Sequence, residues 1–458
     1  MNILSVAKLG GVLLCFIFLS VAVAARTPVQ KVSRGKTPII VIPGMTGSEL
    51  VNSKTGEEAW FKAGRAKDDD IRLPISPNLA RNRDNLIPRD IIRTVKFLKF
   101  LPETEIYERL VNALETRGGY KEGNWNTPAK DGHQDTFYVF PYDWRRDNVE
   151  NARLLMTRVE ALKRKLGKPT LKFNVVAHSM GGLIARYAAM YGKAELPARN
   201  PRPTWAGANH FNKLFLLGTP NEGSVSTLNV LLEGFSYVGG GLNLPFIQNI
   251  DRFDVFTIPS IYQLLPHQGS TFAYDENLKP IEIDIYDPAT WDKYGWSIWL
   301  DDGFTKKFTP LEQKNARPYF AAVLGRAKRF QAALAADSRG NIPVSFYLMG
   351  ADCKETPSAM LLLRDEKKGR WETRFKPDSF TNSTGEKITA DQVKELMVAM
   401  GDSVVTKRSL IGETLVSIGK KIFPATTELF QCEGHSKLVT NPEIQDKLFL
   451  LLNPAAAN

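Results

Sequence analysis

The chain has 458 residues, of which 43% are apolar and 24% are charged, so it can bury a sizeable core and is neither disordered nor fibrous. Its formal net charge of +11 is a modest excess that suits either solubility or contact with an anionic lipid surface. Three cysteines exclude a disulfide-rich scaffold, and no cysteine–histidine cluster has the spacing of zinc ligands, so we expect no metal and no cofactor.

The first segment has the pattern of a secretory signal. Lys8 precedes an uncharged run over residues 9–25, which contains the small-x-small sequence Ala22-Val23-Ala24 near its end. Because the run is short and interrupted by glycines, an uncleaved membrane anchor is the weaker interpretation. We therefore expect a signal peptide at residues 1–24 and a protein that is secreted or periplasmic, or lysosomal in a eukaryote.

Buried strands and an amphipathic helix alternate along residues 25–458. Apolar runs bounded by turn residues predict strands at residues 37–42, 136–140, 171–177, 213–217, 343–349 and 427–431. Apolar residues recur at helical spacing over residues 147–166, behind the capping pair Asp147 and Glu150. The alternation predicts an α/β domain with a mostly parallel central sheet and helices on both of its faces.

Two connections are too long for a compact α/β domain, and we expect them to form cap or lid insertions at about residues 51–130 and 219–340. The second is rich in aromatic residues, which form either the core of the cap or an apolar pocket for an acyl chain. In the first, Arg89, Arg93 and Lys96 fall on one face of a predicted helix, with apolar residues opposite. Such a helix is either a solvated surface helix or one that docks on a membrane.

Ser179 lies in a sequence that predicts a nucleophile elbow. A small-x-Ser-x-Gly pattern alone is weak evidence, but here a buried strand precedes it and a helix follows it. The strained turn needs small residues two positions before and after the serine, and Ala177 and Gly181 meet that condition. The turn also leaves the Met180 N–H at a helix N-terminus, where it can stabilise an oxyanion. The alternative is an ordinary strand–helix junction with an incidental serine.

A serine nucleophile needs a base and an acid, and in this kind of sheet the chain order is serine, acid, histidine. Of the five histidines, His435 follows the last predicted strand, whereas His178 adjoins the serine and the others lie before it or in the connections after it. His435 is therefore the predicted base. The acid is either Asp402, in a tight turn, or Asp352, directly after the fifth strand, and the residues alone leave these two open.

Two further features lie near the same ends of the predicted strands. Cys353 and Cys432 are the cysteines outside the leader, and an oxidising compartment favours a disulfide between them, although spacing does not prove it. Because both follow strand ends, such a disulfide would tether the loop that carries His435. The loop at residues 43–48, after the first strand, is glycine-rich and suits a second oxyanion donor.

Several motifs together resemble the lecithin:cholesterol acyltransferase family, which includes lysosomal phospholipase A and the phospholipid:diacylglycerol acyltransferases. The motifs are Ile42-Pro43-Gly44-Met45-Thr46-Gly47-Ser48, Pro141-Tyr142-Asp143-Trp144-Arg145, Ala177-His178-Ser179-Met180-Gly181-Gly182 and Gly218-Thr219-Pro220-Asn221-Glu222-Gly223-Ser224. Residues 258–266 and 401–405 are similar to further motifs of the family. The resemblance implies an α/β-hydrolase that cleaves a fatty acyl ester, holds the acyl group on serine and passes it to water or to an alcohol.

The resemblance also implies roles for single residues. It makes Ser179, Asp402 and His435 the catalytic triad, and it places Thr46 as the second oxyanion donor beside Met180. Trp60 resembles the aromatic residue that lines the substrate site under the lid.

The chain departs from the family pattern in its insertions. It has no cysteine between Cys15 and Cys353, where family members often pin the lid with a disulfide, and both insertions match poorly. The acyl donor and acceptor therefore stay open.

The predicted function is that of a secreted serine acyltransferase or lipase acting on lipid esters, phospholipids in particular. The expected partner is a lipid ester, with peripheral contact to a membrane or lipid surface. Basic residues form no run interleaved with stacking aromatics, so we expect no nucleic acid partner. The alternatives on the same fold are a short-chain or polyester esterase and a catalytically inactive lipid-binding homologue. The sequence sets no oligomeric state.

Overall fold

The computed structural model describes residues 35–62, 71–95, 104–235, 250–267, 269–270, 272–337, 342–412, 416–417, 420–421 and 425–453. The predicted signal peptide at residues 1–24 lies outside these described residues. Within them, no helix is long and apolar enough to cross a membrane, and no group of three or more histidine, cysteine or acidic side chains is placed to hold a metal ion.

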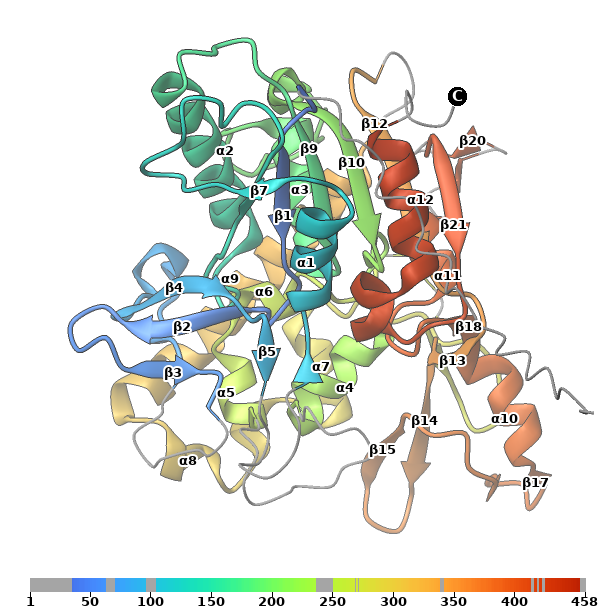
Figure 1. Cartoon of the computed structure of the whole chain (residues 1–458). Helices are drawn as coiled ribbons and strands as arrows, with labels where there is room; N and C mark the ends of the chain where they lie inside the picture. Colours follow the sequence, from blue (N-terminus) through green and yellow to red (C-terminus); the bar gives the residue numbers. More distant parts are fainter. Residues whose placement is uncertain are drawn as a thin grey trace, which may run out of the picture. The chain divides into compact units, whose positions relative to one another are not determined.

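A seven-stranded sheet forms the centre of the molecule (Figure 1), in the order β21-β12-β10-β9-β1-β8-β7. Its neighbouring strands are all parallel, which confirms the predicted mostly parallel sheet. The six predicted strands correspond to β1 (Ile39–Ile42), β8 (Thr136–Val139), β9 (Phe173–His178), β10 (Phe211–Leu217), β12 (Ser345–Gly350) and β21 (Thr427–Phe430). The seventh strand, β7 (Lys121–Glu122), was not predicted, because two exposed charged residues at a sheet edge carry no apolar pattern.

Helices cover both faces of this sheet, and its strands are therefore buried on both sides. In β1, Ile40 and Ile42 share one core with α2 (Asn148–Lys165) and α3 (Met180–Tyr191). Ile39 and Val41 share the opposite core with α1 (Glu108–Thr116) and α12 (Pro442–Leu452). Helix α2 begins as predicted, since the carboxylate of Asp147 accepts hydrogen bonds from two backbone N–H groups of its first turn.

The first long connection, between β1 and β8, does not form the predicted helix near residue 89. It contains a small sheet of β2 (Ser48–Asn52), β3 (Glu58–Trp60) and β4 (Leu86–Ile91), followed by β5 (Thr94–Val95) and β6 (Thr104–Glu105). Pairing of β4 with β2 outweighs the local helical spacing, and Arg89 in β4 forms ion pairs with Glu49 and Glu58. Lys96 lies outside the described residues. The connection ends in α1 and β7, which belong to the central α/β layers and not to a cap.

The second long connection, between β10 and β12, folds into short helices and one long helix. These are α4 (Val225–Glu233), α5 (Arg252–Phe256), α6 (Pro259–Tyr262), α7 (Pro288–Tyr294), α8 (Phe304–Lys307) and α9 (Pro310–Leu334). Its aromatic side chains pack on one another: the Trp291 ring lies 5.6 Å from Trp296 and 5.0 Å from Phe320 of α9, between ring centroids. All three are buried, so these aromatics form the core of the insertion.

A third excursion, between β12 and β21, was not expected. It contains β13 (Lys354–Pro357), β14 (Met360–Asp365), β15 (Arg370–Arg374), α10 (Ala390–Met397), β18 (Val398–Gly401) and α11 (Lys407–Ile411). Strand β13 pairs antiparallel with β18, and this ribbon leads directly to Asp402. The disulfide between Cys353 and Cys432, which the strand ends had suggested, is present.

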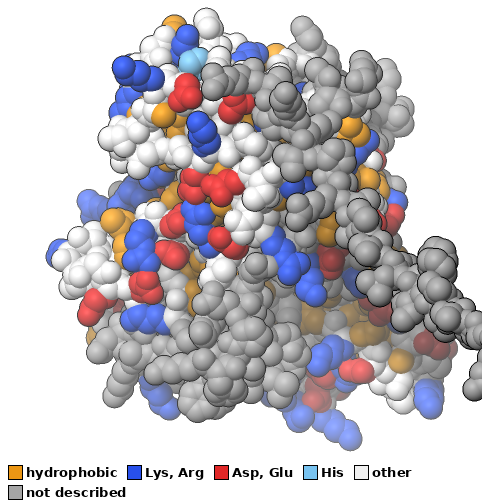
Figure 2. Space-filling model, in the orientation of Figure 1, with side chains coloured by type: hydrophobic (Ala, Val, Ile, Leu, Met, Phe, Trp, Pro, Cys, Tyr) orange, Lys and Arg blue, Asp and Glu red, His pale blue; other side chains and the backbone are white. Residues whose placement is uncertain are grey.

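Charged side chains of both signs are mixed on the face shown in Figure 2. Several basic residues of the described ranges belong to ion pairs; Arg93, for example, bridges Asp90 and Glu122. On the described part of the face in Figure 2, the basic side chains are interspersed with acidic ones and form no single basic patch.

Candidate active site

Ser179 occupies the turn between β9 and α3. Its φ of 52° and ψ of −125° place it in a region that residues other than glycine rarely adopt. The turn is held because the Ser179 N–H donates to the Leu217 carbonyl at 2.8 Å and the Gly182 N–H donates to the Ser179 carbonyl at 3.0 Å. A Cβ on Gly181 would come within 2.4 Å of the Pro43 carbonyl oxygen, so only glycine fits there. This geometry is that of a nucleophile elbow.

His435 and Asp402 meet Ser179 from two other parts of the chain. The His435 Nε2 atom lies 2.9 Å from Ser179 Oγ, and its Nδ1 atom lies 2.7 Å from Asp402 Oδ2. The backbone N–H of His435 also donates to the Asp402 carbonyl at 2.8 Å, which ties the two loops together. The structure therefore brings together the three residues predicted as a triad, across 256 residues of sequence between Ser179 and His435.

The carboxyl group of Asp402 is buried but strongly stabilised as an anion. Its Oδ1 atom accepts hydrogen bonds from the Val404 and Val405 N–H groups at 3.0 and 2.7 Å. Burial raises the pKa of Asp402, but the charge and hydrogen bond of His435 and these two N–H groups outweigh it, and the net pKa is lowered. An ionised Asp402 requires a proton on His435 Nδ1, so Nε2 presents its lone pair to the Ser179 hydroxyl.

Asp352, the competing acid, lies in a different environment. Its carboxylate pairs with the Lys407 ammonium group at 2.9 Å, and its side chain is 37% exposed. Of the two candidates, Asp402 is the one that is buried and hydrogen-bonded to His435, so the geometry favours it over Asp352.

The loop of residues 43–47, here called the oxyanion loop, lies directly against the elbow. A Cβ on Gly44 would come within 3.0 Å of Ser179 Cβ. Thr46 in this loop is buried and has a φ of 61°, and Met180 is the first residue of α3. The two predicted oxyanion donors thus lie on segments that flank Ser179.

Trp60 lies behind the oxyanion loop. Its indole N–H donates to the Thr46 carbonyl at 2.9 Å, and its ring contacts Trp144 at 5.3 Å between centroids. The side chain is completely buried in this structure. Its geometry here is that of a support for Thr46, while its predicted role in lining the substrate site stays a prediction.

Two polar side chains beside the triad were missed as site residues. The Tyr107 hydroxyl lies 2.7 Å from the Gly44 nitrogen and 2.8 Å from His178 Nδ1, and His178 Nε2 lies 3.1 Å from the His435 carbonyl oxygen. In the sequence, the only feature that marked His178 was its position next to Ser179. Tyr107 gave no signal, because its partners are more than 60 residues away in the chain.

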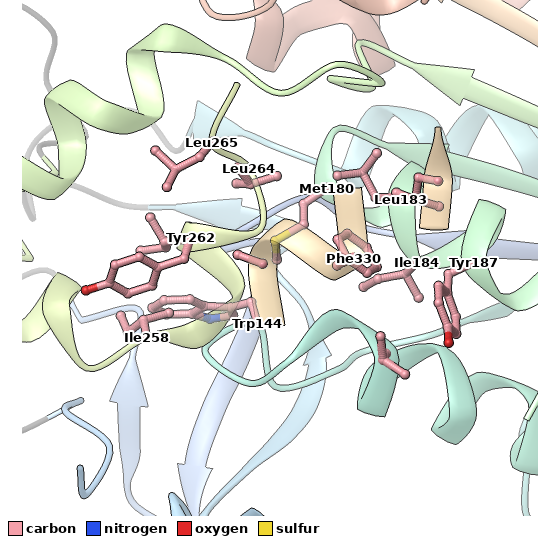
Figure 3. Packing of buried hydrophobic residues seen from close by; sticks show 14 of the residues in the cluster. Trp144, Met180, Leu183, Ile184, Tyr187, Ile258, Tyr262, Leu264, Leu265 and Phe330 are labelled. Atoms are coloured by element: carbon pink, nitrogen blue, oxygen red, sulfur yellow. The ribbon is translucent and has the colours of Figure 1, made fainter. Parts of the chain in front are cut away.

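Apolar packing fixes the helix that follows the nucleophile. Figure 3 shows buried side chains from α3, from residues 258–265 and from α9, where Phe330 stacks on Tyr187 with ring centroids 5.8 Å apart. A Cβ on Gly182 would come within 1.9 Å of Thr219 Oγ1, so the first turn of α3 packs closely against the segment after β10. The elbow therefore has a rigid base.

Comparison with known proteins agrees with this architecture. The family model described as lecithin:cholesterol acyltransferase matches residues 102–295, which include Ser179. A search of curated protein sequences gave no match.

Among solved structures, the chain is similar to that of the Tle4–Tli4 complex, with 14% identity and a TM-score of 0.54 over 92% of this chain and 98% of that one. The mature form of the lipase BlEst2 from Bacillus licheniformis matches with 12% identity and a TM-score of 0.35 over 92% of each chain. The first likeness confirms the fold. The family match confirms the predicted resemblance to the lecithin:cholesterol acyltransferase family and, with it, the predicted enzyme class: the protein is a serine ester hydrolase or acyltransferase.

Proposed function

We propose that the protein is a secreted lipase or acyltransferase that cleaves fatty acyl esters of lipids, phospholipids in particular, through an acyl-serine intermediate. The observation that carries the proposal is the continuous hydrogen-bonded chain from Asp402 through His435 to Ser179, beside the oxyanion loop. This arrangement is what an acyl-transfer enzyme needs to activate a hydroxyl group at neutral pH.

In the first half of the reaction, Ser179 Oγ attacks the carbonyl carbon of the ester while His435 Nε2 takes the hydroxyl proton. The new O–C bond pushes the carbonyl electron pair onto oxygen, and the N–H groups of Met180 and Thr46 stabilise that oxyanion. When the carbonyl re-forms, the bond to the leaving alkoxide breaks, and the alkoxide takes the proton from His435. Ionised Asp402 stabilises the imidazolium throughout.

In the second half, the acyl group leaves Ser179. His435 removes a proton from a water molecule or from an alcohol, whose oxygen attacks the acyl carbon, and the proton then returns to Ser179 Oγ. Water yields a free fatty acid, whereas an alcohol yields a new ester. Which acceptor wins depends on how well the insertions exclude water from the site.

Secretion is supported by the predicted leader and by the disulfide between Cys353 and Cys432. Both cysteines are exposed, and an exposed disulfide persists in an oxidising compartment such as the periplasm, the extracellular medium or the lysosome. Access to a lipid ester also requires peripheral contact with a lipid surface.

The test is to incubate the purified protein with phospholipid vesicles that carry a labelled acyl chain, with and without candidate alcohols, and to measure free fatty acid and new ester. We expect acyl release that is lost in Ser179→Ala, by about a million-fold in kcat, while circular dichroism shows an unchanged fold.

Two other results would replace the proposal. Activity on soluble short-chain esters without activity on vesicles would indicate a short-chain esterase. A folded protein that neither releases acyl groups nor reacts with a serine-directed fluorophosphonate would be an inactive lipid-binding homologue.

A further inference from the structure

We infer that Tyr107 and His178 are positioning residues that hold the oxyanion loop and the His435 loop in register with the nucleophile elbow. The inference rests on the proposed function, because it assigns these two residues a part in the same acyl-transfer reaction. It is carried by a chain of buried hydrogen bonds that joins segments far apart in the sequence.

The direction of each hydrogen bond in the chain follows from its neighbour. A backbone N–H can only donate a hydrogen bond, so the Gly44 N–H donates to the Tyr107 oxygen at 2.7 Å. The Tyr107 hydroxyl in turn donates a hydrogen bond to His178 Nδ1, with 2.8 Å between the two atoms. The His435 carbonyl can only accept, so the single N–H proton of the neutral His178 imidazole lies on Nε2, which donates to that carbonyl at 3.1 Å.

This row of hydrogen bonds forms only while His178 is neutral, because Nδ1 must accept a hydrogen bond. Burial, and in second place the positive charge of His435, lowers the pKa of His178 to about 3. The rings of His178 and His435 are 5.0 Å apart between centroids. His178 therefore keeps its single proton when His435 becomes an imidazolium during the reaction, and the hydrogen bonds stay as they are.

Each end of this row of hydrogen bonds lies next to a group that acts on the substrate. Gly44 belongs to the oxyanion loop, and its Cα region lies against Ser179, since an added Cβ would stand 3.0 Å from Ser179 Cβ and 3.1 Å from His178 Nδ1. At the other end, the acceptor is the backbone carbonyl of His435 itself. A displacement of the oxyanion donors or of the imidazole by about 1 Å costs on the order of 100-fold in rate.

The position of the two residues explains why they suit this role. His178 is the last residue of β9 and adjoins Ser179, so its ring moves with the elbow. Tyr107 directly precedes α1, a helix of the central layers, and is buried. The hydrogen bonds thus tie the oxyanion loop and the His435 loop to the last residue of β9.

The experiment compares kcat and KM on a soluble short-chain ester for Tyr107→Phe, His178→Gln and His178→Asn. The matched control is Tyr138→Phe, because the Tyr138 hydroxyl is also buried and donates to a backbone carbonyl, that of Gly132, at 2.8 Å, away from the triad. We expect Tyr107→Phe to lower kcat by about 10- to 100-fold with little change in KM, and Tyr138→Phe to leave kcat near that of the wild type.

The two His178 variants separate the two hydrogen bonds of the imidazole. The amide nitrogen of a glutamine reaches the position of Nε2 and can donate to the His435 carbonyl, whereas an asparagine amide reaches only the position of Nδ1. His178→Gln is therefore expected to retain more of kcat than His178→Asn. In the double variant Tyr107→Phe/His178→Gln, the loss of kcat should be clearly smaller than the product of the two single losses, because both changes remove the same hydrogen bond between residues 107 and 178.

The inference is overturned if Tyr107→Phe loses no more kcat than Tyr138→Phe, or if the losses of Tyr107→Phe and His178→Gln multiply in the double variant. Tyr107→Phe removes a single oxygen atom, so it keeps the test decisive even if the His178 variants fail to fold. A wild-type protein without esterase activity or fluorophosphonate labelling would instead contradict the proposed function. An active wild type with unaffected variants would contradict this inference alone.

Discussion

Among single side chains, the two candidate acids differ in burial and in partners. Asp402 is 1% exposed and hydrogen-bonded to His435, whereas Asp352 is paired with Lys407 near the surface. Asp402→Asn removes the charge that fixes the imidazole tautomer, so we expect kcat to fall by about four orders of magnitude. Asp352→Asn should leave kcat nearly unchanged. Steady-state kinetics of both variants on one ester check this, and a larger loss in Asp352→Asn would reverse the assignment.

The buried imidazole of His178 makes stability depend on pH. Its folded-state pKa of about 3 lies below the ordinary value of 6.5, so between these pH values only the unfolded chain holds the additional proton. The free energy of unfolding therefore falls as the pH drops from 6.5 toward 3. His178→Gln does not titrate, so its urea-unfolding free energy should depend less steeply on pH between about pH 4 and pH 7.

The control for this experiment is internal. Asp402 also has a lowered pKa and loses its contribution in acid, but only as the pH falls below about 4, and it does so in both proteins. Equal slopes for the wild type and His178→Gln above that pH would show that His178 is not a buried neutral group.

A site residue can be predicted from the sequence when the residues next to it in the chain carry a recognisable pattern. Ser179 can be predicted because a strand, a tight turn and a helix surround it within a few residues, and His435 because the chain order of the triad leaves few histidines. The choice between Asp402 and Asp352 cannot be made from local pattern, since both follow strands and differ only in tertiary contacts. Tyr107 is not predictable at all, because no local pattern marks a residue whose partners are distant in the sequence.

Among the elements, the loops after β12 and β21 are joined by the disulfide between Cys353 and Cys432. Cys353 precedes β13, which pairs with β18 and so leads to Asp402, and Cys432 lies three residues before His435. The disulfide therefore joins the loop that leads to Asp402 to the loop that carries His435. Because both cysteines are exposed, a thiol reductant should reach it.

Reduction of this disulfide is expected to lower the free energy of unfolding by about 2–5 kcal/mol and kcat by several-fold, with KM nearly constant. The measurement is activity and urea unfolding before and after reduction, with free thiols counted to establish that the bond is open. The variant Cys353→Ser/Cys432→Ser, unaffected by reductant, controls for side effects of the reagent. Full reduction without any change in kcat would mean that the loops hold Asp402 and His435 in place without the bond.

The elements also show where sequence patterns fail. The central strands and α2 are predictable because their apolar periodicity and capping are local. Residues near Arg89 have helical spacing but form β4, since hydrogen bonds to β2 and ion pairs to Glu49 and Glu58 stabilise a strand there. The ribbon of β13 and β18 was missed because short, partly exposed strands carry too little periodicity to be recognised.

In the molecule as a whole, both long insertions are fastened to the same turn between β8 and α2. Arg145 is completely buried and pairs with Asp143 in the turn and, through two hydrogen bonds of 2.6 and 2.9 Å, with Asp84 of the first insertion. Asp147 caps α2 and pairs with Arg326 of α9 in the second insertion. The motif that contains Arg145 and its neighbours thus has a structural role that sequence resemblance alone did not explain.

Replacing Arg145 tests whether this attachment holds the first insertion in place. Arg145→Met leaves the buried carboxylate of Asp143 without its cation and removes the donor to the Ile71 carbonyl, so we expect the free energy of unfolding to fall by about 3–5 kcal/mol. The control is Arg83→Met in the same insertion, whose pair with Glu150 at 3.4 Å is half-exposed and should be worth less than about 1 kcal/mol.

Urea unfolding measures both losses, and limited proteolysis should show faster cleavage between β1 and α1 in Arg145→Met only, because the insertion opens before the sheet unfolds. Equal stability losses in the two variants would mean that the buried pair contributes no more than a surface pair. An unchanged cleavage rate, with a stability loss in Arg145→Met alone, would mean that the apolar contacts of the insertion hold it on the sheet without Arg145.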